Sequence, residues 1–192
     1  MTGRTHDLAA FTTLTFLVAT QPLVFMSLAT LVTAVSANMI GGLAPDLDQP
    51  TGGLWHKIPA GTIFGKIAHP FLGSHRTISH SILGFIIAGY LMKALLSYTH
   101  TFLLVDNDLV WFAFMLGYGS HLIMDTFTKE GVPWLFPIPI KFGIPPVKAM
   151  RITTGKFIEK IIVFPGLLLL NGYLVYINYS KFVDFLRHYV VR

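Results

Sequence analysis

The stretch that decides the fold is Gly117-Tyr118-Gly119-Ser120-His121-Leu122-Ile123-Met124-Asp125-Thr126-Phe127-Thr128. It begins inside an apolar run and ends in a polar loop, as a helix does where it leaves a membrane. His121 and Asp125 are four residues apart, so on a helix their side chains share one face, one turn apart. Ionisable side chains at the end of a hydrophobic helix are costly and usually functional. The pair indicates either joint binding of a divalent cation or a structural hydrogen bond between imidazole and carboxylate.

The composition is that of an integral membrane protein. Hydrophobic residues make up 53% of the 192 residues and charged residues 12%, and the mean hydropathy is +0.63. Soluble domains carry about 25% charged residues. The length predicts a single domain, residues 1–192. The chain has no cysteine, so any metal must rest on His, Asp, Glu and water. The net charge of +5 comes mainly from predicted loops, so we expect a lipid bilayer as partner and no nucleic acid.

Apolar runs separated by Pro and Gly predict an all-α fold, a polytopic membrane helical bundle with about 4–5 transmembrane helices. The first run, from Leu8 to Leu43, is too long for one simple span and also for a signal peptide, so we expect it to be retained. Pro22 either divides this run into two helices or kinks a single long one. Two long loops, 44–78 and 128–157, carry Trp and Phe residues expected at the membrane interface. The expected helices cover about residues 8–20, 22–40, 109–126 and 157–179. A further helix is expected to open in the stretch 75–81, with Thr77 or Ser79 as its N-cap, and to run to about Leu96.

The distribution of Lys and Arg predicts the orientation of these helices. With five spans and a cytoplasmic N-terminus, both long loops lie on the cytoplasmic side with most of the basic residues. The loop 98–108 has no Lys or Arg and lies outside. The basic C-terminal tail breaks the rule, so either it folds back or the last span does not cross fully. One face then collects His and carboxylate side chains from every helix end, which predicts a metal centre. These residues are His6, Asp46, Asp48, His75, His80, His121, Asp125 and Glu159.

Roles for the ligands follow from their places in the chain. The helical pair in the central stretch supplies the first two metal ligands. Asp46 and Asp48 alternate in extended chain, so one can bind the metal while the other orients a histidine or bridges two metals; both can also be turn carboxylates. His80 is a better ligand than His75 because it stands at the start of a span. His6 is either a ligand or an exposed terminal histidine.

Three further residues suit the chemistry of an ester or phosphoester. Arg76 and Arg151 can clamp a phosphate in a bidentate way, or simply anchor cytoplasmic loops. Glu159 can act as general base or ligand, or stabilise the N-terminus of its helix. With Asp48, these are the candidate catalytic residues. The remaining histidines have no motif partner; they are His56, His69, His100 and His188.

The polar residues form short motifs in a fixed order. They are His6, Pro45-Asp46-x-Asp48, His75-Arg76-x-x-x-His80-Ser81, Gly117-Tyr118-x-Ser120-His121-x-x-x-Asp125-x-x-Thr128-x-x-Gly131 and Arg151-x-x-Thr154-Gly155-x-x-x-Glu159. Together they resemble the YdjM-like family, described as LexA-regulated (SOS) metal-dependent hydrolases of the inner membrane. The resemblance implies a multi-pass protein of the bacterial inner (plasma) membrane. A looser likeness is to zinc-dependent phospholipase C, which also uses a His-x-x-x-Asp helix pair.

The function expected from these features is metal-dependent hydrolysis. Zn²⁺, or Mn²⁺ as the alternative, would polarise an ester or phosphoester and activate a bound water. A site at the cytoplasmic face beside two apolar loops suits a lipid, although a soluble phosphoester also fits. The alternative is a non-enzymatic protein that carries or senses a metal ion, which is disfavoured because transport sites lie near the bilayer midplane. Haem binding is less favoured still, because haem needs no carboxylate cluster.

Overall fold

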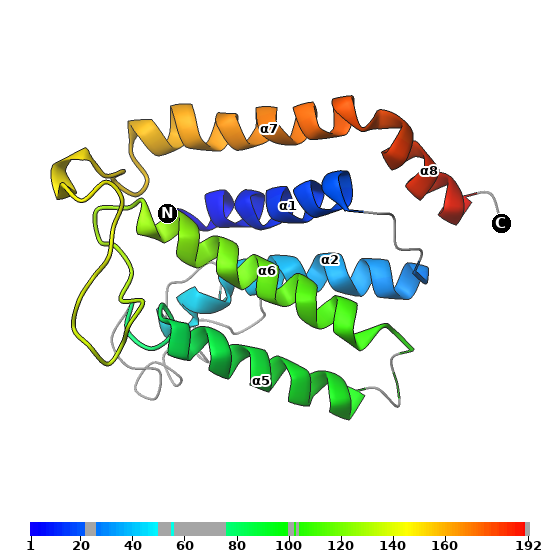
Figure 1. The fold of residues 1–192 in the computed structure, drawn as a ribbon, viewed down its shortest axis with the longest axis horizontal. Helices are drawn as coiled ribbons and strands as arrows, with labels where there is room; N and C mark the ends of the chain where they lie inside the picture. Colours follow the sequence, from blue (N-terminus) through cyan, green and yellow to red (C-terminus); the bar gives the residue numbers. More distant parts are fainter. Residues whose placement is uncertain (22–25, 50–54, 56–75, 100–101, 103, 191–192) are drawn as a thin grey trace.

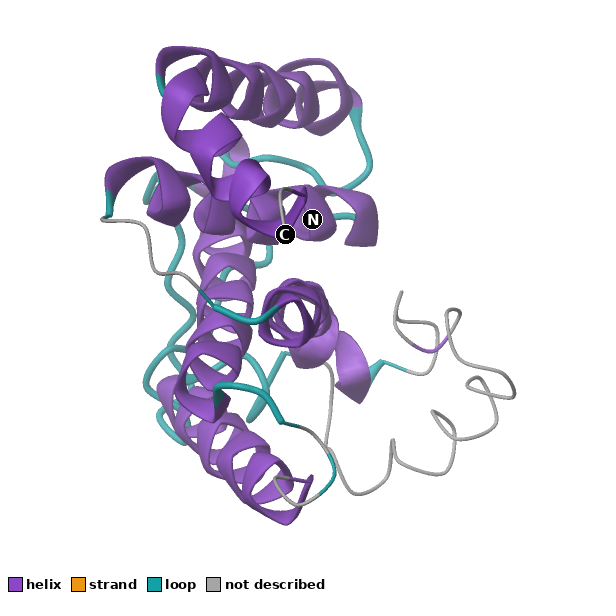
Figure 2. Cartoon of the chain, turned by 90° about the vertical axis from the view of Figure 1, so that its right-hand side faces the viewer, coloured by secondary structure: helices purple, strands orange, loops and turns teal. Residues whose placement is uncertain are grey.

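The structure is a computed structural model that describes residues 1–21, 26–49, 55, 76–99, 102 and 104–190. Within these residues the regular elements are helices, and the β-structure is limited to two isolated bridges, Thr128 with Ile152 and Val132 with Phe142. Figure 2 shows the same helical architecture turned by 90°. The α-helices are α1 (Gly3–Thr20), α2 (Leu28–Leu43), α5 (Ile82–Thr99), α6 (Asn107–Thr126), α7 (Phe164–Ile177) and α8 (Tyr179–Val190). Short helical turns are η1 (Ala44–Asp48), η2 (Lys148–Met150) and η3 (Glu159–Val163).

Local sequence signals explain where these helices begin. The Ser27 hydroxyl accepts a hydrogen bond from Thr30 N at 3.1 Å and caps α2. Asp106 accepts from two backbone amides, at 3.1 and 3.0 Å, and caps α6. α1 ends at Thr20 and α2 starts at Leu28, so the expectation of two helices in the first apolar run is confirmed.

The helices α1, α2, α5, α6 and α7 run in alternating directions along one long axis, and α8 continues outward from the end of α7 (Figure 1). α6 lies between α5 and the α1–α2 pair, while α7 lies beside α1. The N-terminus and the C-terminal end of α6 are at the same end of the bundle, at the left in Figure 1. The start of α5, the turn η1 and the start of η3 lie at that end as well. The expected convergence of helix ends on one face of the bundle is therefore what the structure has.

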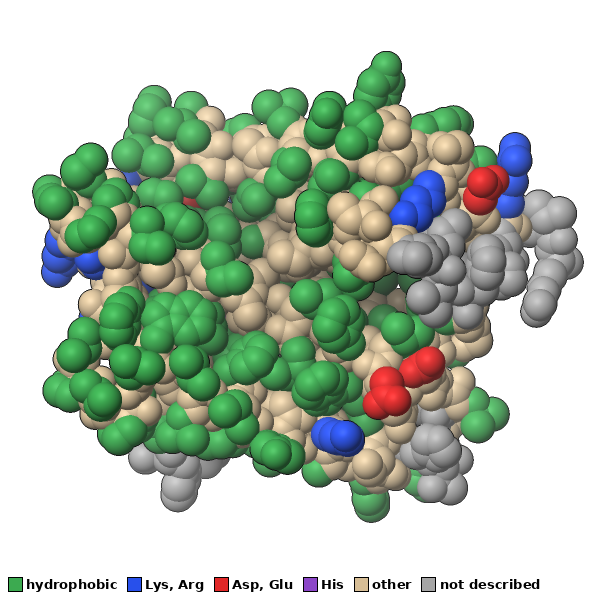
Figure 3. All heavy atoms as spheres, in the orientation of Figure 1, with side chains coloured by type: hydrophobic (Ala, Val, Ile, Leu, Met, Phe, Trp, Pro, Cys, Tyr) green, Lys and Arg blue, Asp and Glu red, His purple; other side chains and the backbone are tan. Residues whose placement is uncertain are grey.

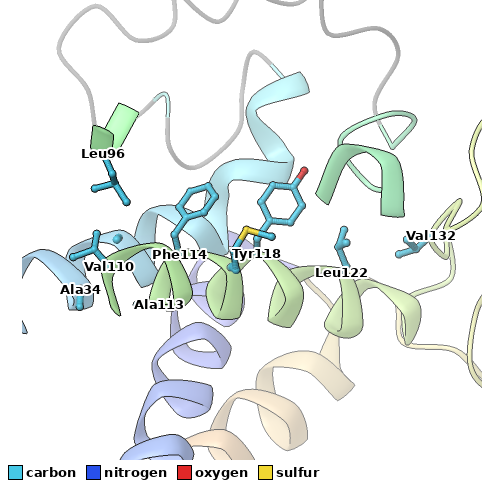
Figure 4. Close-up of a cluster of buried hydrophobic side chains, with 10 residues drawn as sticks. Ala34, Leu96, Val110, Ala113, Phe114, Tyr118, Leu122 and Val132 are labelled. Carbon is cyan, nitrogen blue, oxygen red and sulfur yellow. The ribbon is translucent and has the colours of Figure 1, made fainter. Parts of the chain in front are cut away.

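α2 and α6 approach each other through glycines. A Cβ at Gly117 would lie 2.0 Å from the carbonyl oxygen of Asn38, and a Cβ at Gly41 would lie 2.1 Å from that of Phe114. Small residues allow this approach, as in many membrane helix pairs. The hydrophobic core extends from this contact toward α5 and the loop after α6 (Figure 4). Its labelled members are Ala34, Leu96, Val110, Ala113, Phe114, Tyr118, Leu122 and Val132.

Among the residues that the structure describes, three helical segments are long and apolar enough to cross a membrane: Leu28–Asp48, Ile82–Thr99 and Glu159–Ile177. This is fewer than the predicted 4–5. The helices α1 and α6 are where we expected them, but both carry too many polar side chains, among them the histidines of the central cluster. α6 is instead shielded by its neighbours. Figure 3 shows a face covered largely by hydrophobic side chains, on which no described histidine is visible.

The two long loops differ in how far they are described. Most of the loop 44–78 lies outside the described residues. The loop after α6 folds against the end of the bundle, where Val132 and Phe142 exchange backbone hydrogen bonds of 2.8 and 2.9 Å. α8 begins directly after α7, and Lys181 Nζ donates to the carbonyl oxygens of Ala19, at 2.9 Å, and of Gln21. The basic tail therefore packs at the end of the bundle opposite the predicted metal centre.

Candidate metal centre

Four elements bring imidazole and carboxylate groups together at one end of the bundle. His6 comes from α1, Asp46 from η1, and His80 from the residues just before α5. His121 and Asp125 come from adjacent turns of α6. The side chains of these residues are fully buried except that of Asp46, which is 14% exposed. A buried group of this composition needs a compensating positive charge.

The hydrogen bonds of two histidines determine which ring nitrogen carries the proton. His121 Nδ1 lies 2.7 Å from the carbonyl oxygen of Gly42, which can only accept, so Nδ1 donates. His80 Nδ1 lies 3.0 Å from Ser79 Oγ, and that hydroxyl donates to Asp48 Oδ2 at 2.6 Å. The Ser79 oxygen therefore accepts from His80 Nδ1. In the neutral rings, the lone pairs are then on the two Nε2 atoms.

These two Nε2 atoms face each other at a distance of 3.2 Å. Two lone pairs at this distance repel unless a proton or a cation lies between them. Asp46 Oδ1 is 3.6 Å from both nitrogens, and Asp125 Oδ2 is 3.6 Å from His80 Nε2 and 3.7 Å from His121 Nε2. Bonds of about 2.0–2.2 Å to zinc give tetrahedral edges of about 3.3–3.6 Å. Each carboxylate thus completes a triangle of the size that one ion requires.

His6 adds an unsatisfied group to the cluster. Its ring stacks on that of His121, with centroids 3.6 Å apart and an interplanar angle of 10°. Among the described residues neither ring nitrogen has a hydrogen-bond partner, although the side chain is fully buried. Nε2 lies 3.3 Å from Asp125 Oδ1. Ligand atoms of His6, Asp46 and His121 lie within 4.8 Å of one another, as do those of His80, His121 and Asp125. The residues present therefore fit a divalent metal.

The electrostatic environment of His80 favours a cation. Burial lowers the pKa of this imidazole, but hydrogen bonds and charge from Asp125 and Asp48 outweigh burial and leave the pKa above its ordinary value. A proton on Nε2 and a metal ion would occupy the same position. The acidic surroundings that raise the pKa are also those that would stabilise a bound metal.

Asp48 and Arg76 hold the cluster from outside. Asp48 is fully buried and accepts from Arg76 N at 2.9 Å and from Ser79 Oγ, so it orients His80 through that serine. The Arg76 guanidinium lies 2.6 Å from Asp125 Oδ2 and donates to Thr128 Oγ1 at 2.9 Å. Its φ of 59° places the backbone in the left-handed region that favours glycine, so tertiary contacts must stabilise it. Arg76 thus positions Asp125, and both of its terminal nitrogens, Nη1 and Nη2, are engaged within the protein.

Glu159 lies outside the two groups of potential ligands. Its Oε1 accepts from Thr2 N and Thr2 Oγ1, both at 2.7 Å, and from Thr5 Oγ1 at 2.6 Å. Its Oε2 accepts from Gly155 N at 2.6 Å. Four donors hold the carboxylate in place at the N-terminus of α1, next to the cluster. The arrangement supports a structural role, in which Glu159 joins α1 to the start of the last long helix.

Arg151 also has a structural position. Its Nε and Nη2 donate to the carbonyl oxygens of Pro145 and Pro146, at 2.7 and 2.9 Å. The guanidinium fills the space beside Gly143, where a Cβ would lie 2.2 Å from Nη1. Arg151 therefore shapes the loop after α6 and does not line the cluster. His75 lies outside the described residues.

Some contributors were not identified from the sequence. Ser79 and Thr128 stand next to or within the motifs, and their hydroxyls could have been considered as supporting groups. The Gly42 carbonyl oxygen gives no side-chain signal and becomes visible only when α2 packs on α6. The Met1 amino group forms an ion pair with Asp125 Oδ1, a contact that no sequence pattern predicts.

Comparisons with known proteins agree with the motif pattern. The family model described as YdjM inner membrane protein matches residues 1–183. The chain is also 28% identical over 179 residues to the uncharacterized protein YvsG of Bacillus subtilis (strain 168), covering 92% of this chain and 95% of YvsG. No solved structure matches. The family match covers nearly the whole chain, and with it the cluster and the helices that build it. The chain therefore belongs to the YdjM inner membrane protein family.

Proposed function

We propose that this protein is a membrane-bound, metal-dependent hydrolase that acts on an ester or phosphoester, with a lipid as the favoured substrate class. The observation that carries the proposal is the pair of Nε2 atoms of His80 and His121, 3.2 Å apart and flanked by two carboxylates. His80, His121 and Asp125 are the proposed ligands, and zinc is the proposed ion because it accepts two imidazoles and a carboxylate; Mn²⁺ is the alternative.

His121 limits the centre to one ion at its core. Its Nδ1 is engaged by the Gly42 carbonyl, so only Nε2 can bind a metal. The two groups of potential ligands share the residue His121. They therefore describe two sides of one ion site and not two independent sites. In this arrangement His6 lies on the side of Asp46, where it can join the ligand set or hold Asp125 in place.

The bound ion would polarise the scissile bond and lower the pKa of a water toward about 7. The protein's own groups then have distinct tasks. Asp46 is the member of the cluster with an exposed fraction of 14%, so it can accept a proton from a water that enters from solvent. Ser79 and the Gly42 carbonyl keep the Nε2 lone pairs of His80 and His121 directed at the ion. Arg76 maintains the charge and orientation of Asp125.

The complete burial of most of the cluster favours a second candidate, a non-enzymatic metal-binding protein. Structural metal sites are closed, whereas catalytic ones keep an open position. In the described residues, the opening is limited to the side of Asp46. The two candidates make the same prediction for metal content and different predictions for turnover.

Metal analysis of the purified protein and an activity screen test these proposals in turn. We expect stoichiometric zinc or manganese in the wild type and loss of the metal in the His121→Ala/Asp125→Ala double variant. The control Asp184→Ala changes an exposed carboxylate of α8 and should keep the metal. Retained metal in the double variant would refute these ligands. A panel of ester and phosphoester lipids should then show turnover that Asp46→Asn removes while the metal stays bound. Metal without turnover on any substrate would favour the binding protein.

A further inference from the structure

A large apolar chamber lies at the end of the bundle opposite the metal centre. It has a volume of about 790 Å³, is lined by α1, α2, α6 and α8, and is partly open to the surroundings. Its walls include Phe11 and Val18 of α1, Val35 of α2, Phe112 of α6 and Phe185 of α8. Among the described residues of the walls, the polar side chains are those of Thr15 and Gln21. The Thr15 hydroxyl already donates to the carbonyl oxygen of Phe11, at 3.0 Å.

A partly open hollow of this size and apolar lining is not stable if left empty. Protein interiors are close-packed, and voids larger than a water molecule are few. Water would need two to four polar partners, which these walls do not offer over most of their length. Apolar cavities of about 150 Å³ already take up small hydrocarbons. The chamber is several times larger, so a hydrocarbon occupant is the favoured content.

α8 covers one side of the chamber as an amphipathic lid. Phe182, Phe185 and Leu186 share one face of this helix and line the chamber. Asp184 and Arg187 form an exposed ion pair on the other face. Such helices lie in the membrane interface with their apolar face toward the acyl chains. The hydrogen bond from Lys181 to the end of α1 holds α8 beside the chamber.

The length of the chamber matches one leaflet. Along α1 it extends from Phe11 to Gln21, which at a rise of about 1.5 Å per residue is about 15 Å. This is half of the hydrocarbon thickness of a bilayer, which is about 30 Å. The protein belongs to an inner-membrane family, so the hydrocarbon available at this depth is the acyl chain of a lipid.

We infer that the chamber holds one acyl chain of a membrane phospholipid. The site is separate from the metal centre, and the inference does not depend on hydrolase activity. The bound chain completes the packing among α1, α2 and α6 on one side and α8 on the other. It does so in place of the protein side chains that would fill this space in a soluble bundle.

A pair of substitutions on α2 tests the inference. Val35→Trp places a large side chain into the chamber, whereas Val32→Trp, one turn away on the same helix, adds the same side chain to a position that is 57% exposed and outside the chamber. Each protein is reconstituted in vesicles of phosphatidylethanolamine and phosphatidylglycerol and then exchanged into lauryl maltoside until bulk lipid is removed. Phospholipid per protein chain is then measured by native mass spectrometry.

We expect wild type and Val32→Trp to retain a stoichiometric phospholipid and Val35→Trp to retain several-fold less. No retained lipid in the wild type, or equal retention in a folded Val35→Trp, would overturn the inference. If Val35→Trp does not fold, vesicles of brominated-chain phosphatidylglycerol provide the readout. After detergent exchange, the bromines should quench a Leu14→Trp variant, which faces the chamber, and not Leu169→Trp, which is 75% exposed. Absence of quenching in Leu14→Trp, or equal quenching in both, would equally refute the proposal.

Discussion

Gly117→Ala should separate α2 from α6 and weaken the metal centre, although it adds only one methyl group. The added Cβ would lie 2.0 Å from the Asn38 carbonyl oxygen and 2.8 Å from Gly42 N. Contacts of a Cβ shorter than 3.0 Å do not occur in practice, so the two backbones must move apart by about 1 Å. The Gly42 carbonyl oxygen lies 2.7 Å from His121 Nδ1, so the same movement would break this hydrogen bond.

The substitution should lower both the stability of the protein and its affinity for the metal. Overpacking of this kind costs about 1–3 kcal/mol, of which better helix propensity recovers at most about 1 kcal/mol. The net loss is then about 0–3 kcal/mol, which lowers the melting temperature by up to roughly 12 °C for a chain of this size. Loss of a hydrogen bond that orients a metal-bound histidine typically lowers metal affinity by about 10–100-fold.

Gly119→Ala is the matched control for this experiment. It makes the same chemical change two residues further along α6, where the added Cβ would meet Phe85 Cε2 at an ordinary 3.7 Å. Thermal unfolding in detergent and competitive zinc titration compare the two variants. We expect Gly119→Ala to melt at or above the wild type with unchanged zinc affinity. The reasoning is wrong if Gly117→Ala melts as high as Gly119→Ala and binds zinc equally well.

Four further predictions address the surroundings of the centre. Ser79→Ala should lower zinc affinity by about 10–100-fold because His80 loses the acceptor for its Nδ1 proton. The control Ser97→Ala, on an exposed part of α5, should leave zinc affinity unchanged. Equal zinc affinities of the two variants in a titration would contradict the assignment of the His80 tautomer. Glu159→Gln should destabilise the protein by about 1–3 kcal/mol because a charged acceptor of four hydrogen bonds is lost. The metal content should not change. A variant that is equally stable but metal-free would show instead that Glu159 is a ligand. Removal of metal with a chelator should lower the melting temperature, because an ion present at about 100 times its Kd adds about 2.7 kcal/mol to the free energy of unfolding. An unchanged melting curve would argue against a bound ion in the native state. Accessibility of single cysteines should place residue 140 on the cytoplasmic side and residue 106 on the opposite side, and labelling of both from one side would remove the predicted orientation.

The helices and the end at which polar groups collect could be predicted from the sequence. Hydrophobic runs of span length, Pro22 between two of them and Gly-Pro-rich loops are local features, so they predict α1, α2, α5, α6 and α7 without knowledge of packing. The i, i+4 spacing of His121 and Asp125 is equally local, because helix geometry alone places them on one face. The motif order was sufficient to identify the family, which the comparison confirms.

The number of apolar spans was overestimated because hydrophobic runs do not show which helix is shielded by others. α6 has the length of a span, but its polar residues are tolerated because α1, α2 and α5 surround it. Its place in the middle of the bundle depends on glycine contacts between residues far apart in sequence, such as Gly117 against Asn38. Such contacts leave no periodic signal.

The division of roles among the polar residues was decided by tertiary structure alone. Asp46 and Asp48 are chemically identical and two residues apart, yet one faces the imidazole nitrogens and the other accepts from Ser79 and the Arg76 backbone. Glu159 was expected to act in catalysis, but four donors from the N-terminus of α1 and the preceding loop hold it. Composition and spacing predict which polar side chains share one end of the bundle. Which atom faces which depends on hydrogen-bond partners supplied by other helices. The partner from Gly42 is a backbone carbonyl, a group that every residue type has and that therefore leaves no signal in the sequence.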